Sequence, residues 1–302
     1  MEFQSGAVRP VESISEGWNL IKNNYWTFFL MILVAVVILI AVSFVLGLIN
    51  NLIALGIAAA LGVATTNSGD AVKISASIAP QLISMVISIF TNIIVITLSG
   101  AFFCGIYTAL ARQSSSGIAE FGDLFAGFQK IQACFIYSLV MSVIQFVIGL
   151  VVLLTGSAIG VSAAGLLSTL IKDGKLNPAV FGGLFLVILI FVVISLVINL
   201  IISALTAFVY PLIAERNLSG GEALLLSAKS GLANIGGLIL LLILLGLMGI
   251  GGLVLCLVGF LFVAPVLSAA MFAAYQSVFG RTGGFYQQNP PPPPNFGNQR
   301  AY

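Results

Sequence analysis

Residues that could carry chemistry are few in this sequence. The chain contains no histidine, which removes the commonest metal ligand and the usual general base near neutral pH. Its three cysteines, Cys104, Cys134 and Cys256, lie far apart inside apolar stretches. This spacing is typical of small buried residues and unlike that of a disulfide framework or a metal site. We therefore expect no catalytic residue, no metal site and no cofactor.

Charged and amide side chains offer two further groups of candidate functional residues. Glu215 and Glu222 are close enough in sequence to form an acid–base pair, but solvation and helix capping explain them better. Within the apolar stretches, the polar candidates are Asn92, Gln145 and Asn199. They could line a polar path or a cleft for a lipid headgroup. Hydrogen bonds between helices, at about 0.6 kcal/mol each, are the favoured interpretation because no charged residue accompanies them.

The composition predicts a membrane protein. Of 302 residues, 60% are apolar and 7% are charged, whereas soluble domains carry roughly 25% charged residues. The net charge of +2 is too small to suggest binding of nucleic acid. No ionisable residue lies in the middle of an apolar stretch, which argues against ion-coupled transport, proton relays and voltage sensing. The acidic N-terminal region and the long apolar run from Trp26 indicate an uncleaved first span.

The predicted fold is all-α, with about six transmembrane helices. A helix needs about 20 apolar residues to cross a hydrocarbon core about 30 Å thick. The candidate spans are Trp26–Leu46, Gln81–Ala111, Ile131–Thr155, Ala179–Ile213, Asn234–Gly249 and Leu253–Phe279. In the fourth and sixth spans, Pro211 and Pro265 predict a bend and a kink.

Gly47–Ala64 is ambiguous because it is also apolar. With six spans, most lysines and arginines fall on one side of the membrane, as expected for cytoplasmic loops. A seventh span through this segment would divide the basic residues almost evenly. Six spans are therefore predicted, with both termini in the cytoplasm. Gly47–Ala64 then either extends the first helix or lies at the outer interface.

The sequence predicts that the spans form a threefold repeat of an amphipathic stretch followed by a helical hairpin. Residues 13–112, 113–216 and 217–281 form the predicted units, between an N-terminal tail of residues 1–12 and a C-terminal tail of residues 282–302. The second span of each unit ends in a tyrosine followed by an arginine, an arrangement typical of anchors at the membrane interface. The predicted anchors are Trp18, Trp26, Tyr107, Arg112, Tyr210, Arg216, Tyr275 and Arg281.

The amphipathic stretches predict short helices in the headgroup plane. Ser13–Glu16 and Ser219–Glu222 both have the spacing of a capping box, in which Ser and Glu satisfy free backbone donors. The middle stretch begins at Asp123 with a less clear cap. In the alternative interpretation, these segments are the cytoplasmic beginnings of longer, bent transmembrane helices.

A resemblance to a known family rests on two segments of the sequence. They are Ser15–Lys22 and Val209–Arg216, and the second leads into Glu222, Ala223 and Ser227. Over residues 13–281 the chain resembles a broad group of bacterial membrane proteins that includes the membrane domain of some glycerophosphodiester phosphodiesterases. The sequence has no separate soluble region for the phosphodiesterase domain. The resemblance therefore implies an architecture and a bacterial inner membrane, with no activity attached.

The tail from Thr282 contains Pro290–Pro294 and cannot pack a core, so we expect disorder with a polyproline II stretch. It is either a ligand for an aromatic-lined groove on a cytoplasmic protein or a solubilising tail. The whole sequence predicts a non-enzymatic scaffold or subunit in membrane or envelope organisation. The alternative is a passive transporter or a lipid-translocating protein. Expected partners are membrane lipids and further copies or other subunits, with no nucleic acid.

Overall fold

The computed structural model describes residues 3–60, 74–173, 178–254 and 257–280. Within these ranges the chain is helical and contains no β-strand. The prediction of six helices long and apolar enough to cross a membrane is confirmed. They are α2 (Tyr25–Ala60), α3 (Ile74–Ser116), α5 (Ile131–Asp173), α6 (Pro178–Thr206), α9 (Ile235–Val254) and α10 (Leu257–Phe279).

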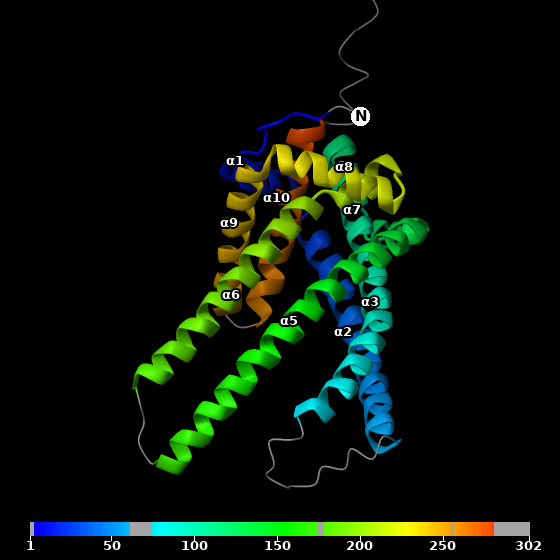
Figure 1. Cartoon of the computed structure of the whole chain (residues 1–302). Helices are drawn as coiled ribbons and strands as arrows, with labels where there is room; N and C mark the ends of the chain where they lie inside the picture. The colour runs from blue at the N-terminus through cyan, green and yellow to red at the C-terminus, as the bar shows by residue number, and fades with distance from the viewer. Residues whose placement is uncertain (1–2, 61–73, 174–177, 255–256, 281–302) are drawn as a thin grey trace, which may run out of the picture.

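The remaining helices gather at one end of the molecule, as Figure 1 shows. We call this group the short-helix layer. It consists of α1 (Pro10–Ile21), α4 (Asp123–Ala126), the 3-10 helix η2 (Gly127–Lys130), α7 (Val209–Arg216) and α8 (Gly220–Ala233). The layer covers the end of the bundle at which most of the large, fully buried side chains lie, including Phe28, Leu212, Leu238 and Tyr275.

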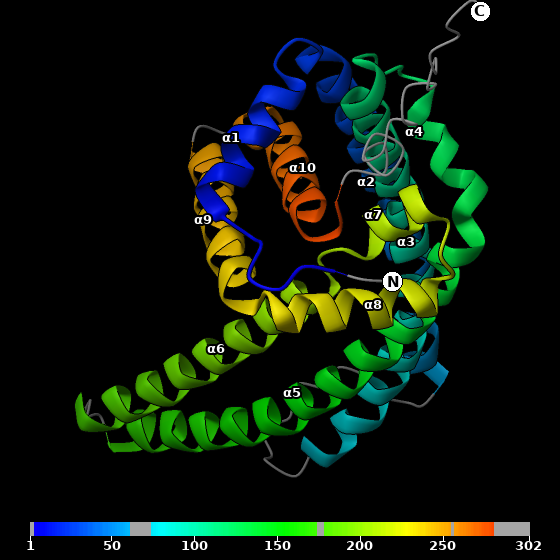
Figure 2. The ribbon, with the colours of Figure 1, turned by 90° about the horizontal axis from the view of Figure 1, so that it is seen from above.

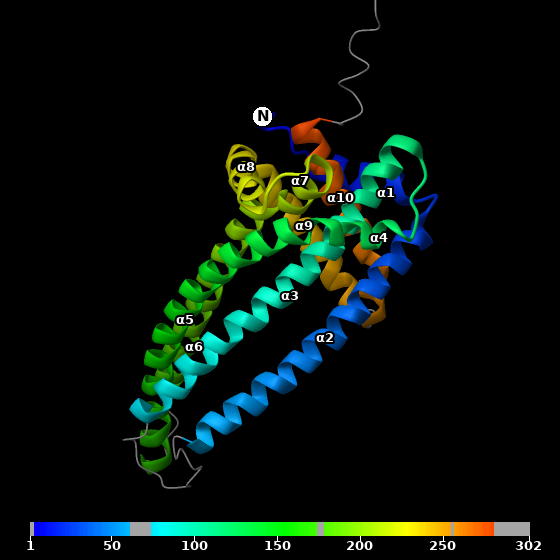
Figure 3. The same ribbon diagram turned by 90° about the vertical axis from the view of Figure 1, so that its right-hand side faces the viewer.

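Helices α2, α3 and α5 are much longer than the two helices of the last hairpin, α9 and α10. Helices α2, α3 and α5 have 36, 43 and 43 residues. At 1.5 Å per residue they measure roughly 54–65 Å, well beyond a hydrocarbon core of about 30 Å. Helices α9 and α10 have only 20 and 23 residues. The longer helices therefore run past the tip of the α9–α10 hairpin (Figure 3).

The ambiguous segment Gly47–Ala64 belongs to the first long helix over its described part. Helix α2 continues without a break from Tyr25 to Ala60, so the segment extends that helix. The last residues of Gly47–Ala64 lie outside the described residues.

The fourth predicted span, Ala179–Ile213, corresponds to the candidate span Phe185–Arg216, and a bend interrupts it near its end, as predicted. Helix α6 ends at Thr206, and α7 begins at Val209. The break is stabilised by Ser227 of α8, whose hydroxyl accepts from the Phe208 N–H (3.1 Å) and donates to the Leu205 carbonyl (2.7 Å). Pro211 lies in the first turn of α7, where its missing N–H costs nothing. The bend thus precedes the proline.

Only one of the two predicted capping boxes forms. The Ser219 hydroxyl accepts from the Glu222 N–H at 3.4 Å, and the Glu222 carboxylate accepts from the Ser219 N–H at 3.2 Å. Ser13 does not cap its helix. Helix α1 already begins at Pro10, and the buried Ser13 hydroxyl donates to the Arg9 carbonyl one turn earlier, at 2.9 Å. Pro10 starts the helix because its fixed φ suits the first turn.

The short helices and the hairpins pack in cyclic order. Helices α4 and η2 pack against α3, α8 packs against α6 and α5, and α1 packs against α10. Each short helix therefore contacts the second helix of the hairpin that precedes it, and the first short helix contacts the last hairpin. Seen from above, the short helices surround the end of α10 (Figure 2).

A glycine and a buried alanine meet at each of these three contacts. A Cβ added to the glycine would lie 2.7, 1.9 or 2.8 Å from a backbone atom of the alanine, so only glycine fits. The pairs are Gly17 with Ala269, Gly127 with Ala101, and Gly231 with Ala204. The three alanines precede the tyrosines of their own chain segments, Tyr275, Tyr107 and Tyr210, by the same spacing.

Candidate functional site

An apolar cavity of about 590 Å³ lies between α2, α3, α9 and α10, and we call it the four-helix cavity. Each helix contributes residues three or four apart, which lie on one face of a helix. The wall includes Ile32, Ala35 and Leu39 of α2, Phe102, Phe103 and Ile106 of α3, Leu242, Leu245, Gly246 and Gly249 of α9, and Phe260, Ala264, Leu267 and Met271 of α10.

The lining of the four-helix cavity is almost wholly hydrocarbon. Among the residues that line it, only Ser99, Tyr107 and Ser268 have polar side chains, and none carries a charge at neutral pH. The volume lies in the range of about 300–1,000 Å³ that is usual for small-molecule sites. Such a surface favours a hydrocarbon chain over an ion or a polar solute, because burying a polar group without a hydrogen bond is costly.

Aromatic side chains close the cavity toward the short-helix layer. Tyr107 stacks near Phe272 with ring centroids 6.2 Å apart, and Phe272 lies 5.9 Å from Tyr275. Tyr275 also contacts Phe279 at 5.1 Å and Phe208 at 6.2 Å. This cluster fills the bundle centre at that end.

At its other end the cavity reaches the tip of the α9–α10 hairpin, where Leu253 and Phe260 line it. Gly252 allows the two helices to meet closely here, since a Cβ would lie 3.0 Å from the Gly259 carbonyl oxygen. Helices α2 and α3 continue past this tip with exposed apolar side chains such as Phe44 and Phe90. The cavity therefore ends beside surfaces that suit lipid chains.

The predicted anchors fall into exposed and buried groups. Trp18 and Trp26 are exposed, and together with Tyr25 they form a continuous aromatic group at the start of α2. Tyr107 and Tyr275, expected at the headgroup level, are instead buried in the core. They differ from the prediction because their helices continue into the short-helix layer, which covers both rings.

The remaining predicted anchor tyrosine, Tyr210, is partly buried between helices. Its ring stacks on Phe103 of α3 at 5.5 Å and meets Tyr137 of α5 edge-on at 5.4 Å. The Tyr25 hydroxyl makes a comparable link between helices, donating to the Phe262 carbonyl of α10 at 2.6 Å. That carbonyl lies one turn before Pro265, inside α10, where the proline disturbs the helical hydrogen bonds.

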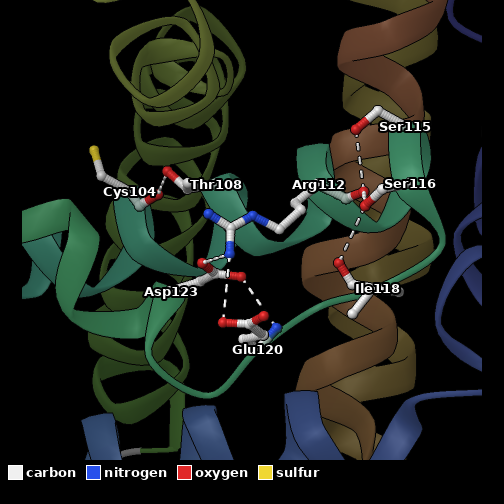
Figure 4. Close-up of polar contacts among 8 residues, drawn as sticks. All are labelled: Cys104, Thr108, Arg112, Ser115, Ser116, Ile118, Glu120 and Asp123. Carbon is white, nitrogen blue, oxygen red and sulfur yellow. Dashed lines mark hydrogen bonds and ion pairs between the residues drawn. The ribbon is translucent and has the colours of Figure 1, made fainter.

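Arg112 holds the end of α3 to α4 through an ion pair, as Figure 4 shows. Its guanidinium lies 2.6 Å from the carboxylate of Asp123, which is only 4% exposed, and 3.8 Å from that of Glu120. The second Asp123 oxygen accepts from the Glu120 N–H at 3.1 Å. Arg112 was predicted as a membrane anchor, and Asp123 only as the start of a helix. Their pairing depends on the turn between them, which the sequence pattern does not reveal.

Arg216 connects α7 to the last helix. Its guanidinium donates to the Tyr275 hydroxyl at 3.2 Å and to the Phe279 carbonyl at 2.8 Å, and it lies 5.1 Å from the centroid of the Phe279 ring. The arginine of the second predicted unit therefore pairs with the tyrosine of the third. The predicted anchor Arg281 lies outside the described residues.

The three intramembrane amides are not brought together. Asn92, Gln145 and Asn199 are exposed on α3, α5 and α6, and none of them lines the four-helix cavity. Asn199 donates to the Ser195 carbonyl of its own helix at 2.8 Å, so this bond is not the interhelical contact that we expected. A buried polar contact between helices instead joins the hydroxyls of Thr97 and Ser138 at 2.7 Å.

Two of the cysteines, distant in sequence, are neighbours in space. The sulfur atoms of Cys104 and Cys134 lie 3.6 Å apart between α3 and α5, and both are free and buried. Cys256 lies outside the described residues. Across the described ranges, no group of three or more His, Cys, Asp or Glu side chains is arranged to hold a metal ion.

Comparison with protein-family models, with curated proteins and with solved structures finds no match to this chain. The resemblance to the membrane domain of glycerophosphodiester phosphodiesterases therefore stays a prediction. The proline-rich segment Pro290–Pro294 lies outside the described residues, so its role as a partner ligand also stays a prediction.

Proposed function

We propose that this chain is a non-enzymatic, multi-pass protein of the bacterial inner membrane that helps to organise the membrane by holding a lipid acyl chain in the four-helix cavity. The observation that carries the proposal is the cavity itself. It has about 590 Å³ of space, a hydrocarbon wall and one end beside lipid-facing helices. In this role the protein is a scaffold or subunit whose lipid contacts are specific.

The proposal includes a threefold repeat with its short-helix layer in the cytoplasm. The cyclic packing order and the three glycine–alanine contacts support the repeat, because each unit meets its neighbour in the same way. Most lysines and arginines fall on one side of the six spans, and this supports placing that side in the cytoplasm. The exposed Trp18 and Trp26 suit a membrane interface near the start of α2.

A variant that fills the cavity tests the proposal. Gly246 lines the four-helix cavity, and a Cβ added there would meet nothing within 4 Å. Gly246→Phe should therefore fold normally while its ring occupies the space of the acyl chain. With a phospholipid that carries a photoreactive group in its acyl chain, we expect α9 and α10 to be labelled about tenfold less than in the wild type. Such a change corresponds to about 1.4 kcal/mol of binding free energy.

The matched control is Leu247→Phe, which adds a ring one residue further along α9. Leu247 is exposed and does not line the cavity, so labelling of the cavity-facing residues should stay at the wild-type level. Equal labelling in Gly246→Phe and wild type would contradict the proposal. Labelling restricted to the outward face of α9 in the wild type would do so as well.

The second candidate is a lipid-translocating protein, and the end of the cavity beside exposed α2 and α3 favours it. The test is the transfer of a fluorescent phospholipid between leaflets in vesicles that contain the purified protein alone. A scaffold should leave this rate at the protein-free level. Rapid transfer that Gly246→Phe abolishes would replace the scaffold proposal with lipid translocation.

A further inference from the structure

A second pocket, separate from the four-helix cavity, lies where α5 begins beside the turn that joins α7 to α8. Its volume is about 380 Å³. Its lining contains both polar and apolar side chains. Those that matter here are the polar Lys130, Gln132 and Asn217 and the apolar Ala133, Ile136 and Ile213.

Lys130 is the cation of this pocket and is held in place. It ends η2, and its side chain is half-buried. The ammonium donates to the carbonyl of Ala214, in the last turn of α7, where backbone carbonyls favour a positive charge. An ammonium has three N–H donors, and the Ala214 carbonyl accepts from one of them.

Ile136 connects the pocket to the surface of α5. It lines the pocket and also belongs to a series of exposed apolar side chains spaced three or four residues apart along the helix. Leu139, Val140, Val143 and Val147 continue it. Residues with this spacing form a stripe on one helix face, and we call it the α5 stripe. A cationic pocket and an apolar stripe are thus continuous.

We infer that this pocket binds the phosphate of an anionic phospholipid at Lys130, with one acyl chain along the α5 stripe. The phosphate contributes the charge that Lys130 attracts, and the amides of Gln132 and Asn217 can donate to its oxygens. Basic pockets between transmembrane helices bind lipid headgroups in the same way. A free phosphate ion would leave the stripe unused, so the arrangement favours a lipid. The inference does not depend on the four-helix cavity.

Binding of a short-chain phosphatidylglycerol to the full-length protein in a neutral detergent, measured by native mass spectrometry, tests the inference. Two further probes separate the parts of the ligand: a diacylglycerol with the same chains, and inorganic phosphate. We expect phosphatidylglycerol to bind at least about tenfold more tightly than either. Equal binding of the diacylglycerol would overturn the role of Lys130. Equally tight binding of inorganic phosphate would contradict the inference that the ligand is a lipid.

Variants locate the site. Lys130→Gln should weaken phosphatidylglycerol binding about tenfold, whereas Lys130→Arg, which keeps the charge, should restore most of it. Lys229→Gln makes the same change in charge at an exposed position on α8 and should bind like the wild type. Ala133→Leu narrows the pocket without removing Lys130 and should also weaken binding.

The test does not depend on how well Lys130→Gln folds, because Ala133→Leu changes the same pocket without removing Lys130. Lys229→Gln controls for the loss of one positive charge elsewhere on the protein. Wild-type binding in both Lys130→Gln and Ala133→Leu would overturn the inference. Gly246→Phe should bind phosphatidylglycerol at Lys130 normally. Failure of the four-helix cavity as a lipid site and failure of this pocket can therefore be told apart.

Discussion

Gly220→Ala is expected to destabilise the folded protein by about 3 kcal/mol, near the upper end of the usual cost of overpacking. A Cβ at Gly220 would lie 2.1 Å from the carbonyl oxygen of Ala133 and 2.6 Å from the amide nitrogen of Tyr137. Both are backbone atoms of α5, which cannot rotate away as a side chain can. Helix α8 would have to move off α5. The measurement is the melting temperature of the purified protein in detergent.

Gly221→Ala is the matched control, because it makes the same change at the next residue of α8. A Cβ at Gly221 would meet nothing within 4 Å. Alanine favours a helix over glycine by about 1 kcal/mol, so this variant should melt at the same temperature or slightly higher. If both variants melt alike, α8 does not rest on α5 through Gly220.

Arg112→Gln is expected to destabilise the protein by about 2 kcal/mol. The substitution leaves the carboxylate of Asp123, which is 4% exposed, without its cation. Breaking a fully buried pair costs about 3–5 kcal/mol, and the expected loss is smaller because the Arg112 side chain is 47% exposed. Besides a lower melting temperature, faster proteolysis should occur between Gly117 and Gly122, the turn that this ion pair holds against α3.

Two comparisons make this prediction specific. Arg9→Gln removes a pair with Glu12 whose side chains are 73% and 60% exposed, and it should change stability by no more than about 0.5 kcal/mol. Adding Asp123→Asn to Arg112→Gln removes the unpaired charge and should recover part of the lost stability. A double variant no more stable than Arg112→Gln alone would show that the ion pair is not the cause.

The fold was predictable from the sequence where lipid is the solvent. A hydrocarbon environment requires long apolar helices, so the long apolar runs in the sequence predict where the six helices lie. Helix ends within the short-helix layer were harder. The break before α7 depends on Ser227 supplying hydrogen bonds from another helix, and no local pattern around Pro211 contains that information.

Capping shows the same limit. Ser219 caps α8 as predicted because the signal is local, whereas Ser13 fails because Pro10, three residues earlier, already begins the helix. Both segments carry the same spacing of serine and glutamate. A preceding proline was the signal that could have separated them.

The candidate site was less accessible than the fold. The residues of α9 that face the cavity recur at helical spacing, from Leu242 through Gly246 to Leu253. Because α9 is apolar on all sides, its sequence does not distinguish this face from the others. The exposed amides, in contrast, stood out in the sequence and lie away from the cavity. A void arises from how four helices meet, so composition and periodicity cannot locate it.

The contact between α1 and α10 joins the first and last described helices, and this sets the order in which the protein can assemble during synthesis. The N-terminal part of a chain emerges first, so the face of α1 around Gly17 has no protein partner until α10 has been made. The hairpins α2–α3 and α5–α6 must enter the bilayer before that contact exists. An unfinished chain therefore leaves this face of α1 uncovered, and completion of α10 covers it.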